Sequence, residues 1–298
     1  RGKVVENQGE NKNDENNKAN EQANIDANSL EKEGMNEKIL VDKNKRIDNI
    51  LNKTNIKRFD INDYNVERKL GSGSYGIIFR IVNKKTQKRY AFKKNVNNNL
   101  NNIENAIKEF EMVSLCHHPN IMVVYGINIR VLDETTYCLD ILMEEAVRDW
   151  NKEIKKHIRE RTHYTEDELI NIIKQIASAL LYMQQNFNIT HRDIKPENIL
   201  VFPNNVYKLA DFGEAKELKI NKQINTLRGT ELYMSPILFN GLKSNKDDVK
   251  HDPFKSDVFS LGFCLIYAAG LNYELLYELR DFENDKELLQ NLRKELKK

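Results

Sequence analysis

The sequence predicts an α+β fold, with strands in the first part of the folded region and helices in the second. Between residues 64 and 143 the apolar residues occur in short β-branched and aromatic runs, which are typical of strands. Beyond residue 150 the apolar spacing becomes helical, and over residues 166–187 it keeps to one stripe. With 298 residues, the chain has room for about two domains of roughly 150 residues each.

Residues 1–61 are expected to form a disordered extension. Residues 1–58 contain no Pro, Phe, Tyr, Trp or Cys and are dominated by Asn, Glu, Lys, Asp and Gln. Such a composition buries too little apolar surface to offset the entropy lost on ordering. The alternative is a short helix over residues 39–51 that docks on the folded part. Because the chain begins with Arg1 and not Met, we expect it to be part of a longer protein.

Composition argues against several classes of function. The formal net charge is +2, from 47 basic and 45 acidic residues, so we expect neither nucleic acid nor a membrane surface as a partner. Cys116, Cys138 and Cys264 are widely spaced, which favours the reducing cytoplasm or nucleus over a disulfide framework or zinc cluster. The longest apolar run, residues 259–271, is shorter than the roughly 20 residues of a membrane span. A buried core helix is expected there.

Two short motifs carry the chemistry of the chain. Residues 191–198 read H-R-D-I-K-P-E-N, which places the acid Asp193, the cation Lys195 and the amide Asn198 in one loop. Thirteen residues after Asn198 comes Asp211, the first residue of the triplet D-F-G. Two carboxylates and an amide can converge on a divalent metal ion, and the glycine lets the backbone turn freely. The combination indicates phosphate chemistry.

A glycine-rich segment precedes these motifs. Residues 71–76 read G-S-G-S-Y-G and stand between two strand-like runs. The dinucleotide-binding form of G-x-G-x-x-G leads into a helix, whereas this one leads into the β-branched and aromatic residues 77–82. A hairpin over nucleotide phosphates is therefore favoured over a merely tight turn. In the next strand Lys93 has apolar neighbours, while Lys94 points to the opposite face.

Together these motifs resemble those of the eukaryotic protein kinases, Ser/Thr type. The resemblance covers about residues 62–280 and implies a bilobal fold. Its N-lobe, residues 62–146, would be an antiparallel β-sheet with one key helix and a hinge at its end. Its C-lobe, residues 147–298, would be mostly helical, and we expect it to be incomplete in this chain. Only a stripe of four leucines is available beyond the apolar helix to cover one of its sides: Leu288, Leu289, Leu292 and Leu296.

The resemblance also implies the roles of the catalytic residues. Asp193 would orient the substrate hydroxyl and take its proton, and Lys195 would meet the γ-phosphate of ATP. Asn198 and Asp211 would hold Mg²⁺. ATP and Mg²⁺ are thus the expected cofactors, and protein substrates the expected partners. The sequence does not predict an oligomeric state.

The remaining nucleotide contacts follow in the same way. Lys93 would fix the α- and β-phosphates and would itself be held by Glu109, with Glu111 as the fallback. At the hinge, Glu144 and Ala146 would offer main-chain groups to the adenine. The full set of expected nucleotide contacts, besides Lys93, comprises Leu70, Gly71, Ser72, Gly73, Ser74, Tyr75, Gly76, Ile78, Ala91, Met143, Glu144, Ala146 and Leu200.

Substrate class and regulation are read from the loop after D-F-G. Lys195, two residues after Asp193, resembles the Ser/Thr enzymes, as does Gly229-Thr230; dual specificity stays open. Thr226 is the candidate regulatory phosphosite, because Arg192 offers a bidentate fork to a phosphate. The alternative is an unmodified loop threonine.

One departure from the family is visible. Ile237 follows Pro236 where the family usually has a buried, ion-paired Glu. This departure suits a rival function, a pseudokinase that acts as a binding scaffold, although the chemistry residues are all present. A phosphate binder outside the kinases has little support, because the chain lacks a G-x-x-x-x-G-K-[ST] loop.

Overall fold

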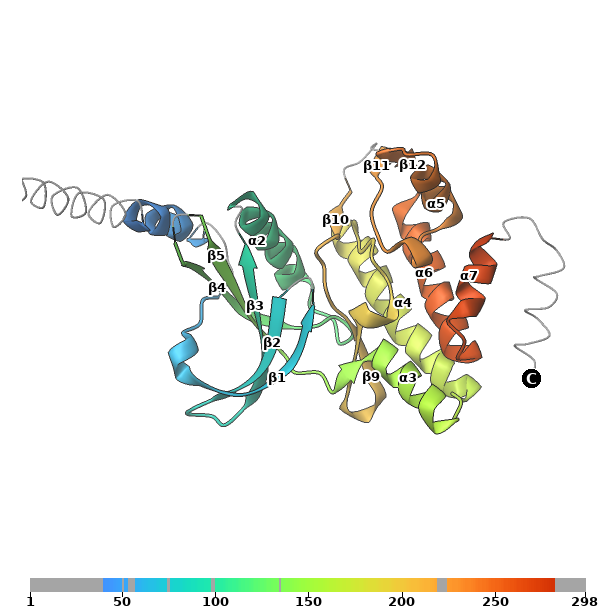
Figure 1. Cartoon of the computed structure of the whole chain (residues 1–298), viewed down its shortest axis with the longest axis horizontal. Coiled ribbons are helices and arrows are strands. Elements are labelled where there is room, and N and C mark those ends of the chain that lie inside the picture. The colour runs from blue at the N-terminus through green and yellow to red at the C-terminus, as the bar shows by residue number, and fades with distance from the viewer. Residues whose placement is uncertain are drawn as a thin grey trace, which may run out of the picture.

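The computed structural model describes residues 40–49, 51–52, 57–73, 76–97, 100–133, 135–218 and 224–281. They form two lobes, one built on a β-sheet and one mostly helical, joined by the segment that follows β5 (Figure 1). The bilobal α+β expectation is confirmed. Expectations for residues 1–39, Ser74, Tyr75 and residues 282–298, including the leucine stripe from Leu288, lie outside the described residues.

The N-lobe sheet is antiparallel, with the strand order β1-β2-β3-β5-β4. The predicted glycine-rich hairpin is the β1–β2 connection, since Gly73 pairs with Gly76. In the centre, Lys93 pairs with Ile78 on one side and Ile141 on the other. Alternation along β3 therefore sends Lys93 and Lys94 to opposite faces, as expected. The N-lobe elements are η1 (Ile61–Asp63), β1 (Tyr64–Gly73), β2 (Gly76–Asn83), β3 (Arg89–Asn97), α2 (Leu100–Leu115), β4 (Val124–Val131) and β5 (Tyr137–Met143).

Helix α2 packs on this sheet through the stripe Ile103, Ile107 and Phe110, which are buried together with residues of β4 and β5. The apolar run of residues 121–125 predicts a strand that starts at residue 121, but β4 starts only at Val124. The preceding residues are drawn instead to the C-lobe, where the N–H of Met122 donates to the carbonyl of Leu209 (2.8 Å). A contact over 87 residues has no local sequence signal.

The C-lobe is built around helices α4 and α6 (Figure 1). Helix α4 has the predicted bounds. A capping box, which Thr165 and Glu168 predict by their spacing, opens it: Thr165 Oγ1 accepts the N–H of Glu168 and Glu168 accepts the N–H of Thr165. No helix among the described residues is long and apolar enough to span a bilayer. The C-lobe elements are β6 (Arg148–Asp149), α3 (Trp150–Glu160), α4 (Glu166–Phe187), β7 (Ile189–Thr190), η2 (Pro196–Asn198), β8 (Ile199–Phe202), η3 (Pro203–Asn205), β9 (Val206–Leu209), β10 (Lys216–Glu217), β11 (Ile224–Thr226), η4 (Glu231–Tyr233), α5 (Pro236–Lys243), β12 (Asp248–Lys250), α6 (Pro253–Gly270) and α7 (Glu274–Asp281).

Part of the segment expected to be disordered is helical in the structure. Residues 40–49 and 51 are helical, and we name them the N-terminal helix. Ile47 and Leu51, one turn apart, are only 3% and 5% exposed and join the N-lobe apolar cluster. The alternative, a docking helix, describes this segment. The average composition of the segment did not predict this helix. Two apolar residues at helical spacing are enough to dock it, because they are buried in a cluster with residues of α2 and the sheet.

Candidate active site

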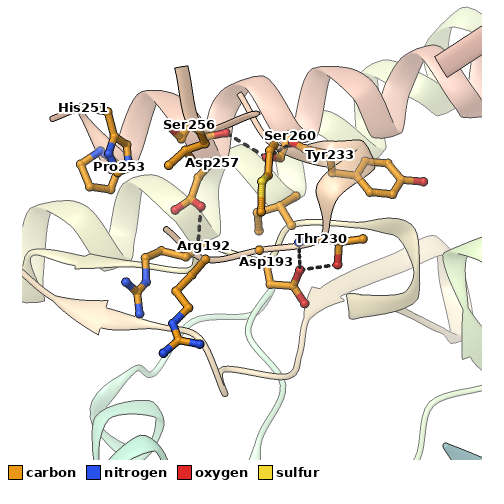
Figure 2. Close-up of a pocket in the computed structure, with 14 residues that line it drawn as sticks. Arg192, Asp193, Thr230, Tyr233, His251, Pro253, Ser256, Asp257 and Ser260 are labelled. Atoms are coloured by element: carbon orange, nitrogen blue, oxygen red, sulfur yellow. Dashed lines mark hydrogen bonds between the residues drawn. The ribbon is translucent and has the colours of Figure 1, made fainter. Parts of the chain in front are cut away.

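The loop 191–198 is attached to the C-lobe core by one carboxylate. Asp257 of α6 is 3% exposed. Its Oδ2 accepts the hydroxyl of Thr190 (2.6 Å) and the N–H of His191 (2.8 Å), and its Oδ1 accepts the N–H of Arg192 (2.8 Å). Figure 2 shows Asp257 reaching from α6 toward the loop. Burial raises the pKa of the Asp257 carboxyl, and the three hydrogen bonds that its oxygens accept oppose this shift. These three bonds fix the entry of the loop on α6.

Asp193 receives four donors at the centre of the site. Its Oδ2 accepts Lys195 Nζ (2.7 Å) and Asn198 Nδ2 (2.9 Å). Its Oδ1 accepts the hydroxyl (2.7 Å) and the N–H (3.0 Å) of Thr230, a pair drawn in Figure 2. Lys195 Nζ also donates to Thr230 Oγ1 (2.9 Å). The three residues assigned from the loop therefore do come together.

Thr230 is a site residue that the motifs did not identify, since it was noted only as a mark of substrate class. It lies 37 residues from Asp193. Gly229 allows the approach: its φ is +116°, and a Cβ there would lie 2.7 Å from the carbonyl oxygen of Arg192. The pair Gly229-Thr230 is the sequence signal that could have identified Thr230 as a site residue, because glycine permits close backbone contact and threonine supplies the donor.

These donors set the charge of Asp193. Burial acts to raise the pKa of its carboxyl, but the hydrogen bonds from Lys195 and Thr230 outweigh burial, so the pKa lies below its ordinary value. Asp193 therefore stays ionised at neutral pH. An ionised carboxylate held by four donors is oriented, and its charge remains available to a hydroxyl that approaches it.

Asn198 and Asp211 lie on adjoining segments. Asn198 is buried and also donates to the carbonyl of Asp193 (2.9 Å). Its own carbonyl accepts the N–H of Ala210 (2.9 Å), the residue before Asp211. Asp211 has a left-handed φ of 61°, and the next ring, Phe212, is buried against His191 with the centroids 5.0 Å apart. The backbone turn and the buried ring place Asp211 beside Asn198 at the wall of a cavity.

That cavity has a volume of about 170 Å³ and lies between the lobes. Its polar residues are Lys93, Glu197, Asn198 and Asp211. Of the expected nucleotide contacts, Ile78, Met143 and Leu200 line its apolar part. Two more are near: Ala91 pairs with Met143 across the sheet, and Leu70 packs against the same apolar cluster. Gly71, Ser72, Gly73 and Gly76 lie at the ends of β1 and β2, where the strands meet their connection.

At the hinge, the side chains of two glutamates are already engaged. The Glu144 carboxylate accepts the N–H of Val123 (2.7 Å) and pairs with Lys208 (2.7 Å). Glu145 pairs with Arg80 of β2 through Nε (2.7 Å) and a terminal nitrogen. The expectation that Glu144 contributes only main-chain groups agrees with this geometry. The Arg80–Glu145 pair, which ties the sheet to the hinge, was not foreseen.

Three further expectations have different outcomes. Glu109 lies in α2 and Thr226 in β11, but the side chains of both lie outside what the structure describes. Arg192, the expected phosphate fork, donates Nε–H to the carbonyl of Glu214 (2.6 Å). Ile237 is 49% exposed at the start of α5, so it does not pack in the core at the place of the family's ion pair.

Comparisons with known proteins agree with this geometry. The family model described as "Protein kinase domain" matches residues 64–297. The "Probable serine/threonine-protein kinase nek2" of Dictyostelium discoideum is 34% identical over 212 residues, which cover 70% of this chain and 48% of that protein. An "Aurora kinase" of Eremothecium gossypii is 33% identical over 233 residues, covering 77% and 57%. The chain thus spans about half the length of these relatives.

Proposed function

Because this chain belongs to the protein kinase family, we propose that it is a serine/threonine kinase, which transfers the γ-phosphoryl group of MgATP to Ser or Thr hydroxyls of protein substrates. The observation that carries the proposal is Asp193, an ionised carboxylate held by Lys195, Asn198 and Thr230 beside a cavity between the lobes. The printed names of the relatives support the Ser/Thr class.

In this proposal each residue has one task. Asp193 accepts the proton of the substrate hydroxyl as the oxygen attacks, and its two oxygens are kept in place by their donors. Lys195, which already contacts Asp193, lies where it can neutralise charge on the transferred phosphate. Lys93, which lines the cavity from β3, fixes the phosphates that do not react. Glu109 of α2 is the residue that we propose to hold Lys93.

The cavity residues fit MgATP. An adenine ring is apolar on its faces, and Ile78, Met143 and Leu200 offer apolar walls. Mg²⁺ binds through one or two carboxylates together with phosphate oxygens. At the polar end of the cavity, Asp211 offers a carboxylate and Asn198 an amide oxygen. When bound, the ion supplies a positive charge that stabilises the transferring phosphate.

The test is transfer of labelled γ-phosphate from ATP, with Mg²⁺ present, to a generic basic protein. Asp193→Asn is expected to lower the rate on the order of 10²- to 10⁴-fold, the usual contribution of a positioned base, with MgATP affinity retained. Asp211→Ala is expected to lose the dependence of nucleotide binding on Mg²⁺. Wild-type turnover in both variants would refute the assignment.

The second candidate is a pseudokinase scaffold, favoured by the missing Glu at position 237. A scaffold and an enzyme differ in one measurement: the scaffold transfers no phosphate at any Mg²⁺ concentration, although it folds. The network around Asp193 favours the enzyme, because a binding scaffold has no use for a carboxylate held ionised by four donors.

Thr226 remains our candidate phosphosite. The support is that Thr226 ends β11 two residues before Arg228, and that Arg228 lines the same pocket as Arg192. Incubation with MgATP followed by peptide mapping tests the modification, and unchanged activity of Thr226→Ala would count against a switch. A cytoplasmic or nuclear location is also proposed, supported by the buried free thiols of Cys116, Cys138 and Cys264; imaging of the tagged protein tests it.

A further inference from the structure

The segment before β1 is attached to the N-lobe at specific points. The carbonyl of Lys57 accepts the N–H of Ile127 (3.0 Å), and the carbonyl of Phe59 accepts Asn128 Nδ2 (2.7 Å). Both donors, Ile127 and Asn128, lie on β4. Gly126 makes this approach possible, because a Cβ there would lie 2.7 Å from the carbonyl oxygen of Lys57. Residues 57–59 are therefore a strap held on the sheet by its backbone.

The strap leads back to the N-terminal helix, which Figure 1 shows in blue beside β4 and β5. Arg58 pairs with Asp48 of this helix (2.7 Å), which joins the helix to the strap. Arg46 pairs with Glu104 of α2 (3.5 Å), and Lys43 Nζ lies 5.4 Å from the ring centre of Tyr137 on β5. The helix thus contacts α2 and the sheet at once.

The apolar side of the N-terminal helix faces the same elements. Ile47 and Leu51 are buried in the cluster that contains Ile103 and Ile107 of α2. The next residue of that stripe, Phe110, belongs to the cluster and also lines the cavity between the lobes. From Ile103 to Phe110 is two turns, about 10 Å along the helix at 1.5 Å per residue. One face of α2 therefore joins the N-terminal helix to the cavity.

We propose that the N-terminal helix and the strap of residues 57–59 are a positioning element for nucleotide binding, built into the chain ahead of the sheet. Docked in cis, the N-terminal helix holds the first half of α2 against β5. The second half of α2, which carries Phe110 and Val113 at the cavity, is thereby held in place. This proposal rests on the proposed function only for its kinetic readout, which is the dependence of phosphate transfer on MgATP.

The proposal needs a position on the N-terminal helix that can be changed without changing the active site. Ile47→Asp places a carboxylate in the apolar cluster and undocks the helix. Asn49→Asp adds the same charge to the same helix at an exposed position and is the matched control. Gly126→Ala acts from the other side, since the new Cβ pushes the strap off β4.

The experiment uses the full chain and measures kcat and KM for MgATP. Ile47→Asp and Gly126→Ala are expected to lower kcat/KM on the order of 10-fold, within the roughly 5- to 150-fold range of coupling between sites. Asn49→Asp is expected to match the wild type. A peptide of residues 38–58, added in trans, is expected to restore Ile47→Asp, and the same peptide carrying Ile47→Asp is not. Rescue separates positioning from simple loss of folding.

The result that overturns the proposal is equal kcat/KM for Ile47→Asp and Asn49→Asp, or a loss that the wild-type peptide does not restore. If the wild-type chain transfers no phosphate, the proposed function fails and the inference is decided by titration with MgADP. Weaker MgADP binding by Ile47→Asp, restored by the peptide, then supports it, and unchanged binding refutes it.

Discussion

Thr230 acts on Asp193 from the far side of the site, and the charge of Asp193 depends on it. The hydroxyl and the N–H of Thr230 both donate to Oδ1. They are among the donors that keep the pKa of Asp193 below its ordinary value against the opposing effect of burial. A carboxyl with a depressed pKa stabilises the fold at pH values above its ordinary pKa, and this contribution is lost as the pH falls through the lower folded pKa.

Thr230→Ala is therefore expected to raise the pKa of Asp193 and to move the acid limb of the activity profile to higher pH. The rate at neutral pH is expected to fall about 10- to 100-fold, because a hydrogen bond to a charged group contributes about 1.5–3 kcal/mol. The measurement is kcat/KM against pH. Thr230→Ser, which keeps the hydroxyl, is the control and should retain the wild-type profile. An unchanged acid limb in Thr230→Ala would remove Thr230 from the catalytic network.

At the scale of elements, helix α4 shows how a local sequence pattern, a capping box, determines where a helix begins. Thr165 caps its first turn and shares three hydrogen bonds with Glu168. The two that the Glu168 carboxylate accepts, from the N–H and then from the hydroxyl of Thr165, lower the pKa of Glu168. The helix positions β7 and the loop 191–198 directly after its C-terminal end, so the cap is remote from the chemistry and can be changed alone.

Thr165→Ala is expected to lower the free energy of unfolding by about 1 kcal/mol, the usual cost of losing an N-cap. Chemical denaturation measures it, with kcat/KM for MgATP as the second readout, which should not change. Thr165→Ser keeps the acceptor, so its free energy of unfolding is expected to fall by no more than a few tenths of a kcal/mol. Equal stability of Thr165→Ala and the wild type would mean that the capping box contributes nothing to this helix.

Helix α4 also shows which parts of the fold and of the site could be predicted from the sequence. The bounds of α4 were predicted because the cap and the apolar stripe are both local. The closeness of Asp193 and Asn198 was predicted from a motif whose spacing is itself short. The start of β4 was not predicted, because the N–H of Met122 donates to the carbonyl of Leu209 across the lobe boundary. The N-terminal helix follows the same rule: Ile47 and Leu51 are buried in a cluster with residues of α2 and β5, and composition contains no information about such a contact.

At the scale of the whole molecule, α6 is the element on which the C-lobe and the site are assembled. Asp257 holds the loop 191–198, and Ser260 donates to the carbonyl of Tyr233 (2.6 Å) on the segment that carries Thr230. One face of α6 thereby fixes both segments that supply donors to Asp193. Residues of both segments line the pocket around Asp257 and Ser260 that Figure 2 shows. Catalytic geometry in this chain is thus a property of the C-lobe core.

Asp257→Asn tests that dependence. The new amide turns an N–H₂ group toward the three donors from Thr190, His191 and Arg192, so at least one buried donor is left without an acceptor. The expected loss of unfolding free energy is about 1–3 kcal/mol. The loop also loses its attachment, so kcat is expected to fall together with stability, whereas KM for MgATP changes less because the cavity is lined mostly from elsewhere.

Val258→Ala provides the control for this last prediction, because Val258 is adjacent on α6 and 63% exposed. A surface change of this kind is expected to stay within about 0.5 kcal/mol of the wild type. Denaturant unfolding and steady-state kinetics on the same samples give both readouts. If Asp257→Asn were destabilised yet kept wild-type kcat at a temperature where it is folded, the loop would be positioned by something other than α6. A loss of kcat in the folded variant is the outcome that the structure predicts.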